Sequence, residues 1–215
     1  MNQLLEQLKD FHYKESNLFS GNSCAIVGSS GNLLNNKFGN EIDNHDFVIR
    51  FNQARVIGYE DHVGSKTSLR VINAHIPAAI NGDMNNFNEN AEVFSKWSPD
   101  IFKELKEKNY LCKTDVNTDI VSKLYPDIVF NKISHHTTSF LLSKINPLPT
   151  CGFLVLAMSL SKFDKITCYG FDQYTGTSDH YYQEVKKYDR GGVHNLSMEQ
   201  MFLSFLHDNK IIELK

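Results

Sequence analysis

The chain has 215 residues, of which 41% are hydrophobic and 22% charged, and these values are ordinary for one soluble globular domain. Its formal net charge of −3 argues against the broad basic face that nucleic-acid binding needs, so we expect no nucleic-acid partner. No stretch approaches the roughly 18 consecutive apolar residues of a membrane span.

The N-terminus, MNQLLEQLKDFHYKES, lacks the basic start and apolar run of a secretory signal. The four cysteines therefore favour free thiols over a disulfide framework. We expect a bacterial-type cytoplasmic location without a transmembrane segment. Peripheral membrane contact, or an anchor lost by truncation, is compatible with this expectation.

The first third of the chain predicts one helix and three strands. Residues 1–22 form an N-terminal helical segment, with apolar residues at helical spacing over 2–12. Apolar runs predict strands over 23–28, 46–51 and 68–73. Because these runs are continuous rather than alternating, they favour a parallel sheet that is covered on both faces.

The middle of the chain, residues 75–147, is variable: it mixes loop, strand and helix patterns. It begins with an Asn-rich loop, followed by a predicted strand over 91–95 and helices over 100–108 and 117–124. Residues 131–147 begin irregularly and predict a helix only around 139–143.

The last third predicts a long apolar helix after Cys151-Gly152, a strand over 165–170, an amphipathic helix over 194–207 and a strand over 210–214. Strands that alternate with helices indicate an α/β layered fold. We therefore predict one domain over residues 1–215 with a Rossmann-like fold, in which helices flank a mainly parallel, twisted sheet.

A glycine-rich turn, Gly28-Ser29-Ser30-Gly31-Asn32, follows the first predicted strand. It matches neither G-x-G-x-x-G nor a P-loop. One interpretation is a tight turn without further function. The other is a nucleotide site built from backbone N–H groups and the Asn32 side chain, because open α/β sheets bind nucleotides at this edge. Asn52 follows the second predicted strand and would lie at the same edge.

A second candidate feature is the start of the apolar helix, at Thr150-Cys151-Gly152. Thr150 is a suitable N-cap residue, and Gly152 permits close packing. A capped helix start also exposes N–H groups and a positive dipole end that attract anions.

The nine histidines show no metal-ligand spacing, so we expect no metal site. His180 lies in a polar segment, and His194 lies where a loop meets the last helix. By spacing alone neither histidine differs from an ordinary surface residue.

Four segments, in order, resemble the four motifs of the animal-type sialyltransferases, glycosyltransferase family 29. Residues 24–73 resemble the long motif and residues 148–171 the short motif. His180-Tyr181-Tyr182-Gln183 resembles the third motif, and His194-x-x-x-x-Glu199 the very short one. Together they cover a little under half of the chain.

This resemblance implies a variant GT-A-like fold and transfer of sialic acid from CMP-sialic acid to a sugar hydroxyl, with inversion and without a metal or other cofactor. The partners would be a nucleotide-sugar donor and a glycan or glycolipid acceptor. Residues 75–147 match none of the motifs, and we expect the acceptor site there. His194 would be the general base, and His180 would contact the CMP phosphate. The remaining implied donor-site residues are Ser29, Ser30, Gly31, Asn32, Asn52, Thr150, Cys151, Gly152 and Tyr181.

These roles are chemically consistent. Negative charge grows on the leaving phosphate, and a histidinium together with a helix N-terminus could stabilise it where other transferases use a divalent ion. An imidazole with an ordinary pKa of about 6.5 is largely neutral at cytoplasmic pH, as a general base requires. His180 would then be charged and His194 neutral.

The sequence departs from the family pattern at three places. Animal members pair the first cysteine of the long motif with one in the short motif, but that second position is Phe163, so we expect Cys24 to pack as a small apolar residue. Ser29 stands where an Asn is usual. Thr150-Cys151-Gly152 replaces Ser-Thr-Gly.

Three alternatives stay open. The donor could carry another CMP-activated 2-keto acid sugar such as Kdo. The chain could be a nucleotide-binding module without catalysis, although it retains both histidines. It could also be an α/β scaffold whose motif matches are accidental.

Overall fold

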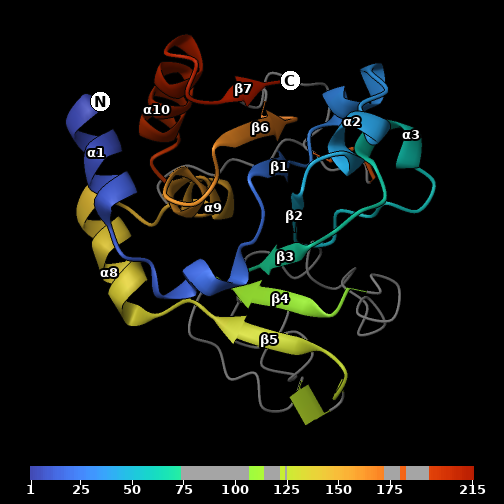
Figure 1. The fold of residues 1–215 in the computed structure, drawn as a ribbon, viewed down its shortest axis with the longest axis horizontal. Helices are drawn as coiled ribbons and strands as arrows, with labels where there is room; N and C mark the ends of the chain where they lie inside the picture. Colours follow the sequence, from blue (N-terminus) through green and yellow to red (C-terminus); the bar gives the residue numbers. More distant parts are fainter. Residues whose placement is uncertain (74–106, 114–121, 124, 172–179, 183–193) are drawn as a thin grey trace, which may run out of the picture.

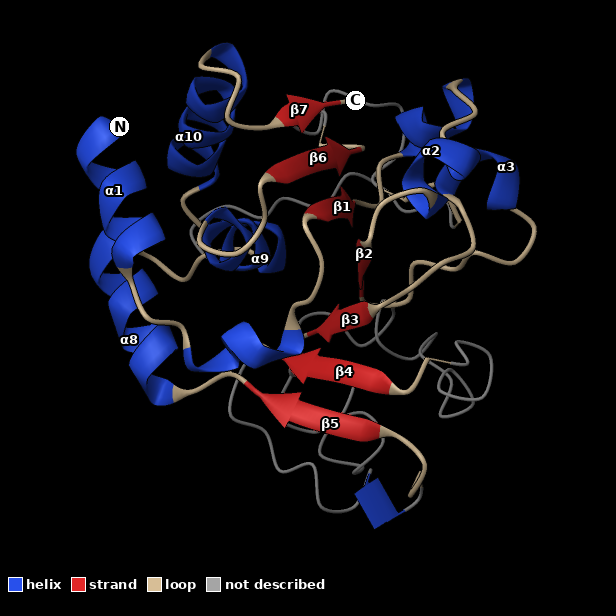
Figure 2. Cartoon of the chain, in the orientation of Figure 1, coloured by secondary structure: helices blue, strands red, loops and turns tan. Residues whose placement is uncertain are grey.

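The computed structural model describes residues 1–73, 107–113, 122–123, 125–171, 180–182 and 194–215. It contains a seven-stranded sheet in the order β5-β4-β3-β2-β1-β6-β7, in which every neighbouring pair is parallel. Helices lie on both faces of this strongly twisted sheet (Figures 1 and 2). The predicted single-domain, Rossmann-like α/β fold is confirmed.

The strands are short. Their bounds are β1 Ser23–Val27, β2 Phe47–Phe51, β3 Leu69–Ile72, β4 Asn109–Cys112, β5 Val129–Lys132, β6 Lys165–Tyr169 and β7 Glu213–Leu214. The α-helices are α1 Asn2–Asp10, α2 Gly39–Asp43, α3 Glu60–Val63, α8 His135–Lys144, α9 Cys151–Leu160 and α10 Leu196–Asp208, and the 3₁₀ helices are η1 Lys14–Leu18 and η2 Gly31–Asn35.

Strand β1 is fully enclosed because its successive side chains enter two separate cores. Cys24 and Ile26 belong to the larger core, beneath α1, α8, α9 and α10. Ala25 and Val27 belong to the smaller core, beneath α2 and α3. The two groups of helices lie on opposite sides of β1 (Figure 1). This alternation explains why the strand is a continuous apolar run.

The order of the strands reverses at β1, which pairs with β2 on one side and with β6 on the other. In open α/β sheets, ligands bind at the carboxyl edge where the strand order reverses. The residues that follow β1 and β6 are therefore the ones that this fold places at the expected ligand-binding edge.

Several predicted boundaries were wrong. The N-terminal segment contains a helix that ends at Asp10, followed by the single 3₁₀ turn η1, rather than one helix over 1–22. Helix α10 begins at Leu196 instead of 194, and the last strand comprises Glu213–Leu214 rather than 210–214. Lys210 has a φ of 58°, a left-handed conformation that interrupts extended backbone.

The middle region was predicted least well. Strands β4 and β5 were missed, and α8 begins at His135, not near 139. Its start is polar, but Ser134 caps it by accepting a hydrogen bond from the Thr137 N–H. The predicted strand over 91–95, and nearly all of the helices over 100–108 and 117–124, lie outside the described residues.

Candidate functional site

The carboxyl ends of β1 and β6 meet at a glycine. The Gly28 N–H donates to the Tyr169 carbonyl at 2.8 Å, and a Cβ at Gly28 would lie 2.8 Å from the Gly170 carbonyl oxygen. Only glycine permits this approach, because both obstructing groups are backbone. The turn after β1 therefore begins directly against the residues that follow β6.

The glycine-rich turn is tight, as the first interpretation expected. Ser30 is the N-cap of η2, and its hydroxyl accepts a hydrogen bond from the Asn32 N–H at 3.1 Å. Gly31 is the first residue of η2. Both Ser29 and Asn32 lie at the carboxyl edge, where the nucleotide interpretation needs them, and their roles in donor binding stay predictions.

The third-motif segment lies beside this turn. The Tyr181 N–H donates to the Ser29 carbonyl at 2.8 Å, so His180 is brought next to the end of β1. The His180 ring stacks on Tyr182, with ring centroids 5.0 Å apart and planes 10° apart. The structure thus joins two motifs that are about 150 residues apart in the sequence.

The Tyr181 side chain is buried, with 5% of its surface exposed. Its hydroxyl donates to the Arg55 carbonyl, and its ring packs edge-on against Tyr59 at 5.1 Å. Burial raises the pKa of Tyr181 to about 12. The ring therefore anchors the segment that contains His180, and direct contact between the ring and the donor stays a prediction.

Asn52, which follows β2, has a structural role at the ends of β2 and β3. Its φ is 46°, a left-handed conformation that Asn tolerates better than most residues. Its side-chain oxygen accepts a hydrogen bond from the Asn73 N–H at 3.1 Å, and its own N–H donates to the Val71 carbonyl. Asn52 therefore ties the end of β2 to the end of β3.

Other long-motif residues hold the loop over 63–67. Arg50 is fully buried, and its guanidinium donates to the carbonyls of Val63 and Lys66 at 2.7 and 3.0 Å. Burial lowers the pKa of Arg50 to about 10. The Asp43 carboxylate accepts from the N–H groups of Ser65 and Lys66. These long-motif residues act as a scaffold for the edge rather than as its surface.

The start of α9 is capped twice. Thr150 is its N-cap, and the Thr150 hydroxyl accepts from the Phe153 N–H at 3.1 Å, as predicted. That hydroxyl also donates to one carboxylate oxygen of Glu199 at 2.5 Å, while the Thr150 N–H donates to the other at 2.7 Å. The Thr150 side chain is therefore occupied within the protein.

The remaining amide groups of this helix start belong to Cys151 and Gly152. The first four N–H groups of a helix have no partner within it, and side chains satisfy those of Thr150 and Phe153. No side-chain acceptor within the described part of the chain binds the N–H of Cys151 or Gly152. A Cβ at Gly152 would lie 2.9 Å from the Phe171 ring, so this helix start lies beside the end of β6.

Glu199 and Lys113 were not predicted as site residues. Burial raises the pKa of the Glu199 carboxyl, and the hydrogen bonds from Thr150 and the nearby Lys113 ammonium partly oppose that shift. Lys113 follows β4 and has only 6% of its surface exposed. The one available signal for Glu199 was its place in the very short motif. Nothing in the sequence marked Lys113.

His194 is held in one orientation by the segment that precedes α9. Its Nδ1 lies 2.6 Å from the Leu148 carbonyl oxygen. A carbonyl can only accept, so Nδ1 bears the proton, and in the neutral ring Nε2 has the lone pair. The N-cap of α10 is Asn195, which accepts from the Met198 N–H. His194 therefore lies just outside the helix.

The predicted residues thus form two groups at one edge of the sheet. Ser29, Ser30, Gly31, Asn32, His180 and Tyr181 surround the end of β1. Thr150, Cys151, Gly152 and His194 surround the start of α9. The two groups meet where Gly28 contacts Gly170, one residue before the Phe171 ring that faces Gly152. Asn52 lies at the end of the neighbouring strand β2.

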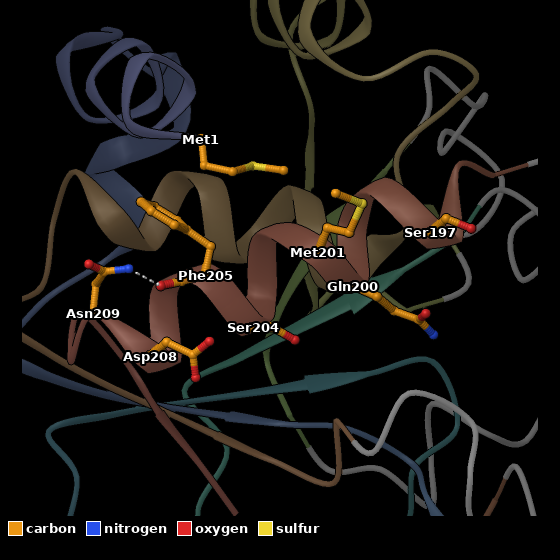
Figure 3. A pocket seen from close by; sticks show the side chains of 8 residues that line it. All are labelled: Met1, Ser197, Gln200, Met201, Ser204, Phe205, Asp208 and Asn209. Carbon is orange, nitrogen blue, oxygen red and sulfur yellow. Dashed lines mark hydrogen bonds between the residues drawn. The ribbon is translucent and has the colours of Figure 1, made fainter.

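A surface groove lies elsewhere, along the outer face of α10 (Figure 3). It is lined by Met1, Ser197, Gln200, Met201, Ser204, Phe205, Asp208 and Asn209. None of these is a predicted site residue, so the groove is distinct from the edge described above. Among the described helices, none is both long and apolar enough to cross a bilayer.

Comparisons with known proteins agree with the motif resemblance. A family model described as glycosyltransferase family 29 (sialyltransferase) matches residues 1–211. The mouse CMP-N-acetylneuraminate-beta-galactosamide-alpha-2,3-sialyltransferase 2 is 27% identical over 203 residues, which cover 89% of this chain and 56% of the relative. The mouse alpha-N-acetylgalactosaminide alpha-2,6-sialyltransferase 1 is 28% identical, covering 89% and 43%. The chain spans about half the length of these curated relatives.

Solved structures show the same fold. A crystal structure of a mammalian sialyltransferase in complex with Gal-beta-1-3GalNAc-ortho-nitrophenol has a TM-score of 0.64 at 22% identity, covering 100% of this chain and 77% of the other. The Campylobacter jejuni sialyltransferase CstII in complex with cytidine-5'-monophosphate has a TM-score of 0.52 at 15% identity, covering 91% and 79%. The fold is thus the GT-A-like sialyltransferase fold. By the match of the family model, the chain belongs to glycosyltransferase family 29, the sialyltransferase family.

Proposed function

We propose that this protein transfers sialic acid from CMP-sialic acid to a hydroxyl group of a glycan or glycolipid, with inversion at the anomeric carbon and without a divalent metal. One observation supports this most directly: the Leu148 carbonyl holds His194 in the tautomer that presents a basic Nε2. A general base needs a defined tautomer and orientation as well as a suitable pKa. His194 has the first two by its hydrogen bond.

In this mechanism, His194 Nε2 accepts the proton of the acceptor hydroxyl as that oxygen attacks the anomeric carbon. The bond from the anomeric carbon to the CMP phosphate oxygen breaks, and its electron pair leaves with CMP. Because attack and departure occur on opposite faces of the sugar, a single displacement inverts the configuration.

The leaving phosphate gains negative charge, which donors fixed in advance can stabilise. Such donors are the helix-start amides of Cys151 and Gly152, which have no side-chain acceptor among the described residues, together with the dipole of α9. His180 would add a positive charge from the side of β1. These groups would do without a metal what a divalent ion does in other transferases.

The Thr150 hydroxyl has a different task. Since it donates to Glu199 and accepts from Phe153, it shapes the helix start, and its direct contact with the donor stays a prediction. The replacement of the family's Ser-Thr-Gly by Thr150-Cys151-Gly152 is compatible with donor binding because backbone amides make the contact.

The deciding experiment is a transfer assay with CMP-sialic acid or CMP-Kdo and a panel of galactose- and N-acetylgalactosamine-terminated oligosaccharides, with EDTA present. We expect transfer from CMP-sialic acid at an undiminished rate in EDTA, and a product anomer opposite to that of the donor by NMR. Transfer only from CMP-Kdo would assign the alternative sugar. Binding of CMP without any transfer would leave a nucleotide-binding module.

The matched variants are His194→Ala and His207→Ala. His207 is an exposed histidine near the end of α10, so its loss should leave turnover unchanged. Loss of a general base typically lowers turnover by roughly 10²-fold or more, and we expect this for His194→Ala with CMP affinity retained. Equal turnover in both variants would remove His194 from this role.

We also propose a cytoplasmic location. The four cysteines, Cys24, Cys112, Cys151 and Cys168, are free thiols, which suits a reducing compartment. Cys24 is fully buried in β1 and packs as a small apolar residue, as expected. Fractionation of the producing cell, with a cytoplasmic enzyme as the marker, would test the location.

A further inference from the structure

Arg70 lies on β3 and is fully buried. Its guanidinium donates to the carbonyls of Asn52 and Ala54 at 2.9 and 3.0 Å, and to one oxygen of the Glu107 carboxylate at 2.5 Å. The other oxygen of that carboxylate accepts from the Tyr110 hydroxyl at 3.3 Å. A buried ion pair therefore holds two backbone carbonyls of the segment that follows β2.

The energetics of this pair favour a role in geometry. The side chains of Arg70 and Glu107 are 0% and 10% exposed, so both charges have lost most of their water. A buried ion pair is often no more stabilising than apolar residues of the same volume, because removal of the charges from water is costly. A guanidinium, however, presents several donors in one fixed plane. Here those donors fix where the two carbonyls point.

The segment over 52–55 in turn holds Tyr181. The Tyr181 hydroxyl donates to the carbonyl of Arg55, the last residue of that segment. The Tyr181 ring packs edge-on against Tyr182, with ring centroids 5.1 Å apart, and the Tyr182 ring stacks on the ring of His180 at 5.0 Å. The location of Tyr181 therefore affects His180 twice, through the backbone that joins the two residues and through the ring between them.

We propose that the buried pair of Glu107 and Arg70 positions the ring of His180, and thereby sets how well that ring stabilises the leaving phosphate. The pair acts through the segment over 52–55 and the Tyr181 hydroxyl. Because both residues act through others, they are positioning residues and not catalytic ones. The inference rests on the proposed function, in which His180 contacts the CMP phosphate.

Two substitutions interrupt this series of contacts at different points. Glu107→Gln removes the charge that pairs with Arg70, and Tyr181→Phe removes only the hydroxyl that reaches the carbonyl segment. The matched controls are Glu15→Gln and Tyr13→Phe. Glu15 is a buried carboxylate that accepts two hydrogen bonds at the start of α8, and Tyr13 is a buried tyrosine of the larger core. Urea unfolding of all four variants compares their losses of stability.

The first readout is turnover with CMP-sialic acid and the acceptor identified by the transfer assay. We expect Glu107→Gln and Tyr181→Phe to lower kcat by about 10-fold or more, since misplacement of a group by about 1 Å can cost about 10²-fold. The donor KM should change less, because the charge on the phosphate is largest in the transition state. Both control variants should keep wild-type turnover, even where they lose as much stability. Turnover that falls equally in the controls would overturn the proposal.

A double-mutant cycle with His180→Ala separates positioning from a general structural effect. Without His180 there is no ring left to position, so the addition of Tyr181→Phe or Glu107→Gln should change turnover by no more than about twofold. If each substitution costs the same factor with and without His180, the proposal is wrong. If Glu107→Gln does not fold, Glu107→Asp keeps the charge but shortens the side chain, and it enters the same cycle.

One measurement is independent of catalysis. The NMR signals of the His180 ring, assigned by their loss in His180→Ala, should move in Tyr181→Phe and Glu107→Gln but not in the two control variants. Signals that stay in place would overturn the positioning, even if the wild type transfers sialic acid. If the signals move but the wild type transfers no sialic acid, or His180→Ala loses no turnover, then the proposed role of His180 fails while its placement by the pair stands.

Discussion

The turn after β1 and the start of α9 lie at the same edge of the sheet, but they are held in different ways. The turn depends on backbone contacts and near neighbours: Gly28 against Tyr169 and Gly170, and Ser30 against Asn32. The start of α9 depends on two side chains, the Thr150 hydroxyl and the carboxylate of Glu199, which lies 49 residues from Thr150 in the sequence. The turn should therefore be sensitive to added volume, and the helix start to lost charge.

The largest effect on stability is expected from added volume at the turn. In Gly28→Ala the new methyl group would meet two backbone carbonyls, which cannot move aside without separating β1 from β6. We expect the free energy of unfolding to fall by about 3 kcal/mol, near the upper end for overpacking. Gly152→Ala is the matched control, since its methyl group meets the side chains of Phe171 and Thr150 rather than backbone, and alanine favours a helix. Equal losses in urea titrations of the two variants would contradict this distinction.

Loss of charge at the helix start should have the next largest effect. Glu199→Ala removes the acceptor of both the Thr150 N–H and its hydroxyl. We expect the free energy of unfolding to fall by roughly 2 kcal/mol, the scale of hydrogen bonds to a charged group after the cost of burying that charge. Chemical denaturation of this variant beside Glu6→Ala, an exposed site on α1, measures it. A loss no larger than in Glu6→Ala would show that α9 does not need this carboxylate.

Removal of the cap itself should cost less. Thr150→Ala keeps the backbone N–H that donates to Glu199, so only the hydroxyl contacts are lost. A missing N-cap typically lowers stability by about 1 kcal/mol. Thr150→Ser retains the hydroxyl and should be close to wild type. A double-mutant cycle with Glu199→Ala measures the coupling, and strict additivity would mean that the two side chains act independently.

The smallest effect concerns pH. Because the pKa of Glu199 is raised in the folded protein, its contribution to stability is full below its ordinary value of 4.5 and is lost as the pH rises through the folded value. The wild type should therefore lose stability relative to Glu199→Gln as the pH rises from 4.5 towards neutrality. Parallel unfolding curves of the two proteins across this range would show that burial of Glu199 has no net cost.

The difference between local and long-range contacts also explains which strands and helices could be predicted from the sequence. Strands β1, β2, β3 and β6 and helix α9 were recognisable because each consists mainly of buried apolar residues. Strands β4 and β5 were not, since β4 has only three buried residues and β5 has none. Strand β4 is defined by its pairing with β3, and β5 by its pairing with β4, rather than by their own composition.

The residues of the candidate site also differ in how well the sequence predicted them. The turn after β1 and the Thr150 cap are local patterns, and both lie where they were predicted. The hydrogen bond from Thr150 to Glu199 joins two elements far apart in the sequence, and spacing within either element cannot reveal it. Lys113 was missed for a related reason, because a lysine after a short strand is ordinarily a surface residue.

The hydrogen bond between His194 and the Leu148 carbonyl has a consequence for motion. Together with the contact of Glu199 with Thr150, it fastens the beginning of α10 to the segment that leads into α9 at two points. A displacement of α10 would therefore carry the imidazole and the helix start along as one rigid body.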